Sequence, residues 1–231
     1  DRWVDEAARE AASRGVVGIV DFEIADNLAA WTRRIQAGTR SLRVDAGVWR
    51  EHLDRPIGLE IATGDTIPDT AGLLRLGPFK IITDGSLNSR TAYCADPYPG
   101  MHGAGAYGVL NTPTEELTAL LRHVRSKGIT AAVHAIGDRA NTLALDAFAA
   151  SGARGYIEHA QLVSDDDVAR LATLDLVASV QPEHAMDDRD VADHHWAGRT
   201  GGAFAFGSLA RAGVRMAFGS DAPVAPLDPW A

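Results

Sequence analysis

The chain has 231 residues, of which 46% are hydrophobic and 23% are charged, and its formal net charge is −9. This length and composition suit a soluble globular protein with a substantial core. The acidic balance excludes binding of nucleic acid through a basic stripe. No apolar run approaches the length of a membrane span, so no membrane partner is expected. The single cysteine, Cys94, excludes an internal disulfide and favours a reducing, cytoplasmic location.

Apolar runs of strand length alternate with helical patterns along the chain. In order, the sequence predicts helix 2–13, strand 15–22, helix 27–37, strand 41–48, strand 79–83, helix 112–127, strand 129–133, helix 141–152, strand 156–158, a helix opened by Ser164, strand 176–180, helix 203–212 and strand 214–218. Strands that alternate with helices in this way predict a parallel α/β architecture.

Capping signals and apolar patterns support several of these elements. Thr112, Pro113 and Glu115 form a helix opening, with threonine at the N-cap and glutamate at the capping-box position. The run 15–22 (GVVGIVDF) is continuously apolar, which is typical of a strand covered on both faces. Three segments lack such patterns and are expected to be loops, the first with a short helix: 52–71, 87–109 and 181–196.

A histidine follows two consecutive strand predictions. His134 comes after the run ITAAV, and His159 comes after YIE. A helix of crossover length separates them, so adjacent parallel strands would hold both imidazoles at one end of a sheet. In a β/α barrel this end carries the chemistry, because the loops after the strands converge there. Lys80, in an apolar strand, and Asp221, in the GSD turn after the last strand, would reach the same end. These four residues predict a metal site.

Five stretches of the chain resemble the amidohydrolase superfamily, specifically its family 3 branch, which is similar to N-substituted formamide deformylase. They are FKIITDGSLNSRTA (79–92), AAVHAIGDRA (131–140), YIEHAQLV (156–163), VASVQPEHAMDD (177–188) and FGSDAPVAPLDP (218–229). The resemblance spans nearly the whole chain, in the family's order. It implies a metal-dependent (β/α)8 TIM barrel that hydrolyses a C–N, amide-type bond of a small molecule through a metal-activated water.

The resemblance also implies roles for the four residues. His134 and His159 would bind one metal, and Asp221 would bind metal and handle the water proton. Lys80 would bridge two metals when carboxylated by carbon dioxide; burial lowers the pKa of a lysine and makes that reaction feasible. An ion pair with Asp84 is the alternative for Lys80. The cofactor is expected to be one or two divalent ions, zinc first, although iron, manganese and nickel suit the same ligands.

The sequence departs from the family at the first strand. The family has a His-x-His pair after that strand, and no His-x-His occurs here. Counted back from the fifth strand, residues 15–22 correspond to the second, which predicts an incomplete barrel of strands 2 to 8. We therefore expect one partial TIM-barrel domain over residues 1–231, interior to a longer hydrolase and without the family's small β-sandwich. Open strand edges in such a barrel predict self-association into a homo-oligomer.

Three further residues are predicted to bind substrate at the strand ends. Asp84 and Arg90 lie in the loop after the fourth strand, and His184 follows the seventh. Arg90 could hold a carboxylate or carbonyl through its forked donors; a salt bridge that fixes the loop is the alternative. For His184 the alternative is a loop histidine outside the site.

Three functions stay open at the level of sequence. The first is the metal-dependent amidohydrolase. The second is a truncated barrel that lacks the His-x-His ligands, binds metal weakly and is catalytically incomplete. The third is a metal-independent barrel lyase that uses Lys80 as a Schiff-base amine. No motif in the loops identifies the substrate.

Overall fold

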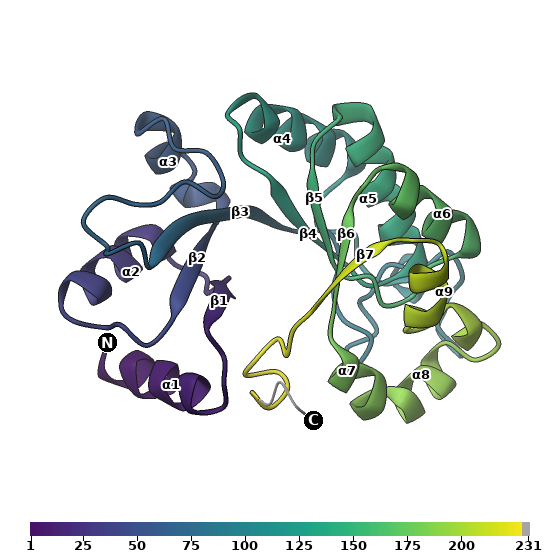
Figure 1. The fold of residues 1–231 in the computed structure, drawn as a ribbon. Helices are drawn as coiled ribbons and strands as arrows, with labels where there is room; N and C mark the ends of the chain where they lie inside the picture. The colour runs from purple at the N-terminus through teal and green to yellow at the C-terminus, as the bar shows by residue number, and fades with distance from the viewer. Residues whose placement is uncertain (228–231) are drawn as a thin grey trace. The chain divides into compact units, whose positions relative to one another are not determined.

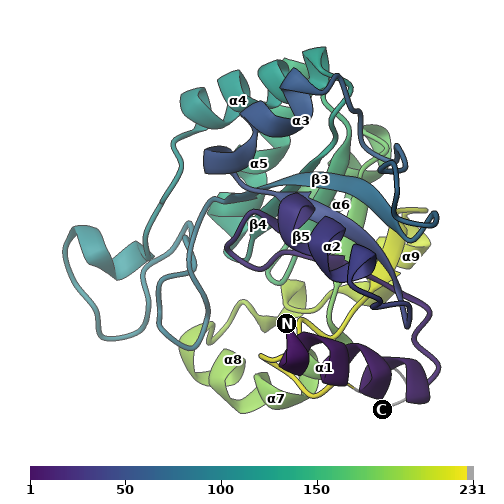
Figure 2. The same cartoon turned by 90° about the vertical axis from the view of Figure 1, so that its left-hand side faces the viewer.

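The computed structural model describes residues 1–227 (Figures 1 and 2). Its elements in chain order are α1 Arg2–Ser13, β1 Gly18–Asp21, α2 Asn27–Gln36, β2 Arg43–Val48, η1 Arg50–His52, α3 Asp54–Gly58, β3 Leu74–Ile82, η2 Ala104–Tyr107, α4 Thr114–Ser126, β4 Ala131–Ala135, α5 Asp138–Ser151, β5 Gly155–His159, α6 Asp165–Thr173, β6 Val177–Val180, α7 Pro182–Asp187, α8 Arg189–His195, η3 Thr200–Gly202, α9 Phe206–Arg211 and β7 Arg215–Phe218. The last two residues of the stretch 218–229, and the end of the predicted domain 1–231, lie outside the described residues.

The strands form one sheet in the order β1-β2-β3-β4-β5-β6-β7, and β1–β2, β2–β3, β5–β6 and β6–β7 pair in parallel. Parallel strands in sequential order, with helices in the connections, confirm the predicted α/β class. Among residues 1–227, no helix combines the length and apolarity that a membrane span requires.

The chain divides into two compact units. The first contains residues 1–80, 124–131 and Leu227, and the second contains 81–123 and 132–226. In the first unit, α2 packs against β2 (Figure 1). Leu28, Trp31 and Ile35 of α2 are buried.

Asp45, a charged residue within the second predicted strand, pairs with the neighbouring strand. Asp45 of β2 lies opposite Arg75 of β3 in the parallel register. The Arg75 guanidinium donates to both Asp45 carboxylate oxygens, at 2.8 and 3.0 Å. A cross-strand charge pair of this kind accommodates both residues in the sheet, and the prediction of a strand here is confirmed.

Two strand predictions differ from the structure. β3 begins at Leu74 rather than at residue 79. The strand runs through Gly77 and Pro78, which lie at a register shift opposite Gly47. Proline and glycine are tolerated inside a sheet at such irregularities. A Cβ on Gly77 would lie 2.8 Å from the carbonyl of Ala46, so the close approach of the two backbones requires glycine.

The first strand was predicted to be covered on both faces, and this is wrong. β1 has only four residues, with alternating exposed and partly buried positions, and Val20 is 50% exposed. β1 stands at the edge of the strand order. The apolar run alone therefore could not show which faces other elements cover.

Helix caps in the second unit follow the sequence closely. The Ser164 hydroxyl accepts a hydrogen bond from the backbone N–H of Asp167 at 3.2 Å, so Ser164 is the N-cap of α6. Gly152 ends α5 in the left-handed conformation, with a φ of 65°. The exception is Thr112, whose prediction as an N-cap is wrong: α4 begins at Thr114, and the Thr112 hydroxyl donates to the Ile82 carbonyl at 3.0 Å.

The segment 181–196 was predicted to be a polar loop, and this too is wrong. It forms two short helices, α7 and α8, which lie side by side (Figure 1). Pro182 occupies the first turn of α7. Helices of six and seven residues contain less than two turns, so no amphipathic period can develop in the sequence. On α8 and just after it, only Ala192 and Trp196 are buried.

The loop 87–109 is partly buried, at Leu87, Ala92, Cys94, Tyr98 and Ala106. It joins a buried apolar cluster, here called the loop cluster, that comprises Leu87, Ala92, Cys94, Tyr98, Ile136, Leu162, Ala192 and Trp196. Its members come from the loops after β3, β4 and β5 and from the α8 segment. The long loop is therefore fixed over the ends of the strands that carry the candidate site.

Candidate metal centre

His134 lies on β4 and is held through one ring nitrogen. Its Nε2 is 3.3 Å from the Gly85 carbonyl oxygen and 3.4 Å from Oδ1 of Asp84. The Gly85 carbonyl can only accept, so Nε2 is the protonated nitrogen and Nδ1 carries the lone pair. A histidine whose second nitrogen donates to a carboxylate or carbonyl is the usual arrangement for a metal ligand.

Asp84 is fully buried and forms the base on which His134 rests. Its two carboxylate oxygens accept hydrogen bonds from the backbone N–H groups of Tyr93, Ile136 and Gly137, at 2.9, 3.1 and 2.9 Å. The carboxylate thus ties the loop after β3 to the loop after β4. Asp84 was predicted to bind substrate, and its burial favours a positioning role.

His159 ends β5 and is held through the other ring nitrogen. Its Nδ1 lies 2.8 Å from Oε1 of Gln181, whose Nε2 donates to the Ser179 carbonyl at 3.4 Å. That amide orientation makes Oε1 the acceptor, so Nδ1 donates and Nε2 carries the lone pair. The backbone of His159 has a φ of 75°, a left-handed conformation that is unfavourable for a side chain of this size.

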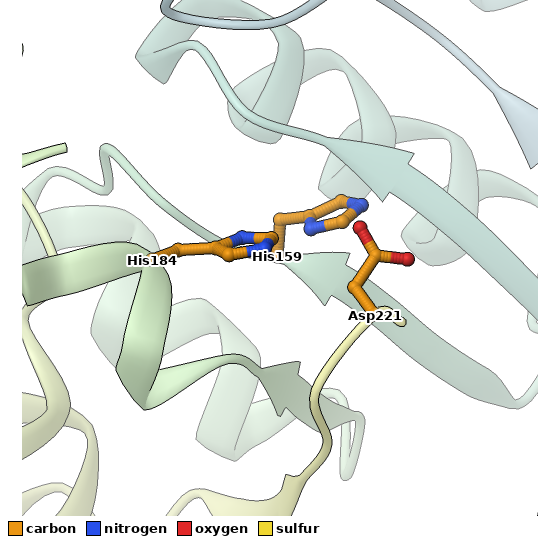
Figure 3. Close-up of side chains that lie close together, drawn as sticks. All are labelled: His159, His184 and Asp221. Carbon is orange, nitrogen blue, oxygen red and sulfur yellow. The ribbon is translucent and has the colours of Figure 1, made fainter. Parts of the chain in front are cut away.

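Three side chains of the second unit converge on one point: His159, His184 and Asp221. One ligand atom from each lies within 4.8 Å of the corresponding atoms of the other two. Figure 3 shows them pointing toward one another from β5, from α7 and from the loop after β7. Asp221 is exposed and, like His159, has a positive φ of 54°. Positive φ angles at two candidate residues that lie close together in space are typical of a functional site.

His184 adds an observation that a ligand would explain. Its Nε2 is buried and has no hydrogen-bond partner among the described residues. Imidazole nitrogens and a carboxylate are donors that zinc and related divalent ions accept. The three residues therefore fit a divalent metal.

The other predicted ligands have different surroundings. The imidazole centroids of His134 and His159 are 4.6 Å apart, so the two rings are in contact, but His134 is not part of the three-residue group. Lys80 belongs to the first unit, where it is buried and its Nζ lies 4.8 Å from the centroid of the Phe22 ring. Arg90 is exposed on the loop after β3 with a φ of 56°.

Sequence reasoning missed two supporting residues. Gln181 orients His159, and Asp188 joins three segments: its carboxylate accepts from Nδ2 of Asn88 at 2.7 Å and from Nε2 of Gln161 at 3.1 Å. Asp188 stands at the junction of α7 and α8. The stretch 177–188 contains both residues, but nothing in its pattern distinguishes them from solvated polar side chains.

Comparison with known proteins gives consistent matches. The sequence profile of the amidohydrolase family matches residues 1–231. The putative amidohydrolase YtcJ of Bacillus subtilis strain 168 is 32% identical over 207 residues, which cover 87% of this chain and 37% of that protein.

Two solved structures superpose on 99% of the chain. They are uncharacterised metal-dependent hydrolases from Pyrococcus furiosus and Pyrococcus horikoshii OT3, with TM-scores of 0.84 and 0.87 and sequence identities of 29% and 31%. The chain spans 47% and 46% of their lengths. This similarity confirms the predicted fold, in which the strands are those of an incomplete (β/α)8 TIM barrel.

Proposed function

Because this chain belongs to the amidohydrolase family, we propose that it carries the metal centre of a hydrolase that cleaves a C–N, amide-type bond of a small molecule with water. The observation that carries the proposal is the pairing of His134 and His159. Each ring has one nitrogen held by a protein acceptor, which directs the lone pair to the other nitrogen. Metal-binding histidines almost always donate their second ring N–H to a carboxylate or carbonyl in this way.

The proposed ligands are His134, His159 and Asp221. Zinc is the first choice of ion, because two imidazoles and a carboxylate leave a coordination position for water in a catalytic site. A second ion would require Lys80 in its carboxylated form as the bridge. The Nζ of Lys80 lies 4.8 Å from the centroid of the Phe22 ring, a contact that an ammonium group makes, so this bridge requires Lys80 to lose its proton before it reacts with carbon dioxide.

When bound, the ion lowers the pKa of its water to about 7 and polarises the scissile carbonyl. Asp221 then accepts the water proton and delivers it to the leaving nitrogen. A positioned acid–base group of this kind contributes roughly 10²–10⁴-fold to the rate. The exposed position of Asp221 gives its carboxylate access to an incoming substrate.

The proposed substrate class rests on the family resemblance. We propose an amide-type small molecule, in line with the resemblance to N-substituted formamide deformylase. Arg90, exposed on a loop that the loop cluster fixes, would bind a substrate carboxylate or carbonyl through its forked donors. The single, buried Cys94 is compatible with the cytoplasmic location that we propose.

Metal binding by the purified chain tests this proposal. We expect one equivalent of zinc, or two if Lys80 bridges, and loss of most of it in His159→Ala. His123→Ala is the matched control, because it removes an exposed imidazole from α4. Absence of specific zinc binding would contradict the proposal and favour the lyase, which reduction with borohydride would then trap as a carbonyl adduct on Lys80.

A further inference from the structure

We infer that His184 is a third histidine ligand of the proposed ion, supplied by the short helix after β6. This inference rests on the proposed function and deepens it. Neither the family resemblance nor the sequence pattern gives His184 this role, since it was predicted only to bind substrate. The structure instead gathers His184 with His159 and Asp221.

The first argument is geometric. The rings of His159 and His184 stack with their centroids 6.0 Å apart and their planes at 12°. One ligand atom of each lies within 4.8 Å of the other and of a carboxylate oxygen of Asp221. Ligands that share a zinc ion at 2.0–2.2 Å stand somewhat closer than this (roughly 3–4 Å apart). Small side-chain rotations would therefore bring the three groups onto one ion.

The second argument is the unsatisfied nitrogen. Nε2 of His184 is buried without a partner among residues 1–227, although buried polar atoms are nearly always hydrogen-bonded. A solvated loop histidine would expose this atom, and a purely structural histidine would pair it. A metal ligand does neither before the ion is bound.

The third argument is that the protein fixes the position of His184 from both sides. Three residues before it, Gln181 holds the ring of His159. Four residues after it, Asp188 donates its N–H to the His184 carbonyl at 2.9 Å, while the Asp188 carboxylate is held by Asn88 and Gln161. α7 is thus anchored at both ends, and the imidazole it carries is left facing His159.

Two imidazoles and a carboxylate on one side of an ion form the facial arrangement that leaves positions open for water and substrate. His134, the remaining proposed ligand, lies beside this set, with its ring in contact with that of His159. The ion would be held by residues of β4 and β5 and by residues that follow β6 and β7, four consecutive strands of the sheet.

Binding of Co²⁺ alone tests the inference, because its visible absorption reports the number of ligands independently of activity. We expect His184→Gln to weaken Co²⁺ binding by more than ~100-fold, which exceeds the 10–100-fold effect of losing a group that only orients a ligand. The absorption band should also change in shape. His194→Gln, an exposed histidine on α8, is the matched control and should bind Co²⁺ like the parent chain.

The outcomes separate the inference from the function on which it rests. If His159→Gln loses Co²⁺ while His184→Gln retains both affinity and spectrum, His184 contacts substrate and the inference is overturned, whereas the metal centre stands. If neither variant changes Co²⁺ binding, the metal centre itself is contradicted.

A measurement on the unaltered chain tests the same inference without depending on whether the variants fold. Zn²⁺ should shift the ¹⁵N resonance of one ring nitrogen of His184 together with that of Nε2 of His159. A shift at His159 with none at His184 would also overturn the inference.

Discussion

The two histidines on β4 and β5 differ in which ring nitrogen the protein holds. For His134 it is Nε2, held by the Gly85 carbonyl and Asp84; for His159 it is Nδ1, held by Gln181. The spacing of strands and histidines was enough to predict that both imidazoles reach one end of the sheet. The spacing could not indicate which ring nitrogen donates a hydrogen bond, because that choice depends on acceptors 22 or more residues away in sequence.

The surroundings of the Asp84 carboxylate could not be predicted from the sequence either. Its place in the DGS turn after β3 suggested an open position at the site. The structure buries it completely under three backbone N–H donors and the His134 ring. Burial of a loop residue depends on the loops that cover it, and the covering loops follow β3 and β4.

Replacing Asp84 by Asn should destabilise the protein and weaken metal binding. Each carboxylate oxygen faces two donors, so the amide NH₂ must oppose two N–H groups in either orientation. Loss of two hydrogen bonds to a charged group costs roughly 3 kcal/mol or more. We expect a drop of that size in the free energy of unfolding in urea, and ~10–100-fold weaker zinc binding. Asp96→Asn, on the exposed part of the same loop, is the control; equal stability of both variants would contradict the positioning role.

At the scale of elements, the site depends on segments that have no regular pattern in the sequence. The seven strands and most helices were predicted within a few residues, because they follow apolar runs and capping residues. α7 and α8 were not predicted as helices, and the burial of part of the loop 87–109 was not predicted either. Short helices and buried loops owe their form to tertiary contacts, here the loop cluster and the Asp188 carboxylate.

Cys94 provides a probe of this packing. Its thiol is buried, and its pKa is raised by burial and by the negative charge of Asp138. The thiolate is the reactive form, and a raised pKa keeps the group protonated as pH rises through its usual range, so alkylation at pH 8 should be slow in the native chain.

Asp188→Ala should accelerate that alkylation. The substitution removes the carboxylate that accepts from Asn88, which lies on the same loop as Cys94. Loss of one such hydrogen bond should favour local opening roughly tenfold or more. Iodoacetamide labelling followed by mass spectrometry measures the rate, with Asp187→Ala as the exposed neighbour. Labelling of the parent chain at the rate of the chain unfolded in about 6 M urea would show that Cys94 is not protected by packing.

At the scale of the whole molecule, the order of seven parallel strands was readable from the alternation of patterns. The family resemblance placed them in a TIM barrel, and the structural similarity to the two archaeal hydrolases agrees. The boundary between the two compact units was not readable. It falls inside β3, α4 and β4, where the sequence carries no linker signal.

A single partial-barrel domain is still our prediction for the chain, and unfolding tests it. Trp31 is buried in the first unit and Trp196 in the second. Variants that retain only one of the chain's five tryptophans, either Trp31 or Trp196, report each unit separately by fluorescence. We expect coincident urea transitions, because small single domains unfold cooperatively; separated midpoints would indicate two domains.

The most direct test of the account is anomalous scattering at the zinc edge from crystals grown with zinc. We predict a peak bounded by Nε2 of His159, a ring nitrogen of His184 and a carboxylate oxygen of Asp221, with distances of about 2.0–2.2 Å. A zinc-loaded crystal without a peak beside His159 and Asp221 would contradict the metal centre and with it the proposed hydrolysis, whereas a peak there with His184 turned away would overturn only the role inferred for His184.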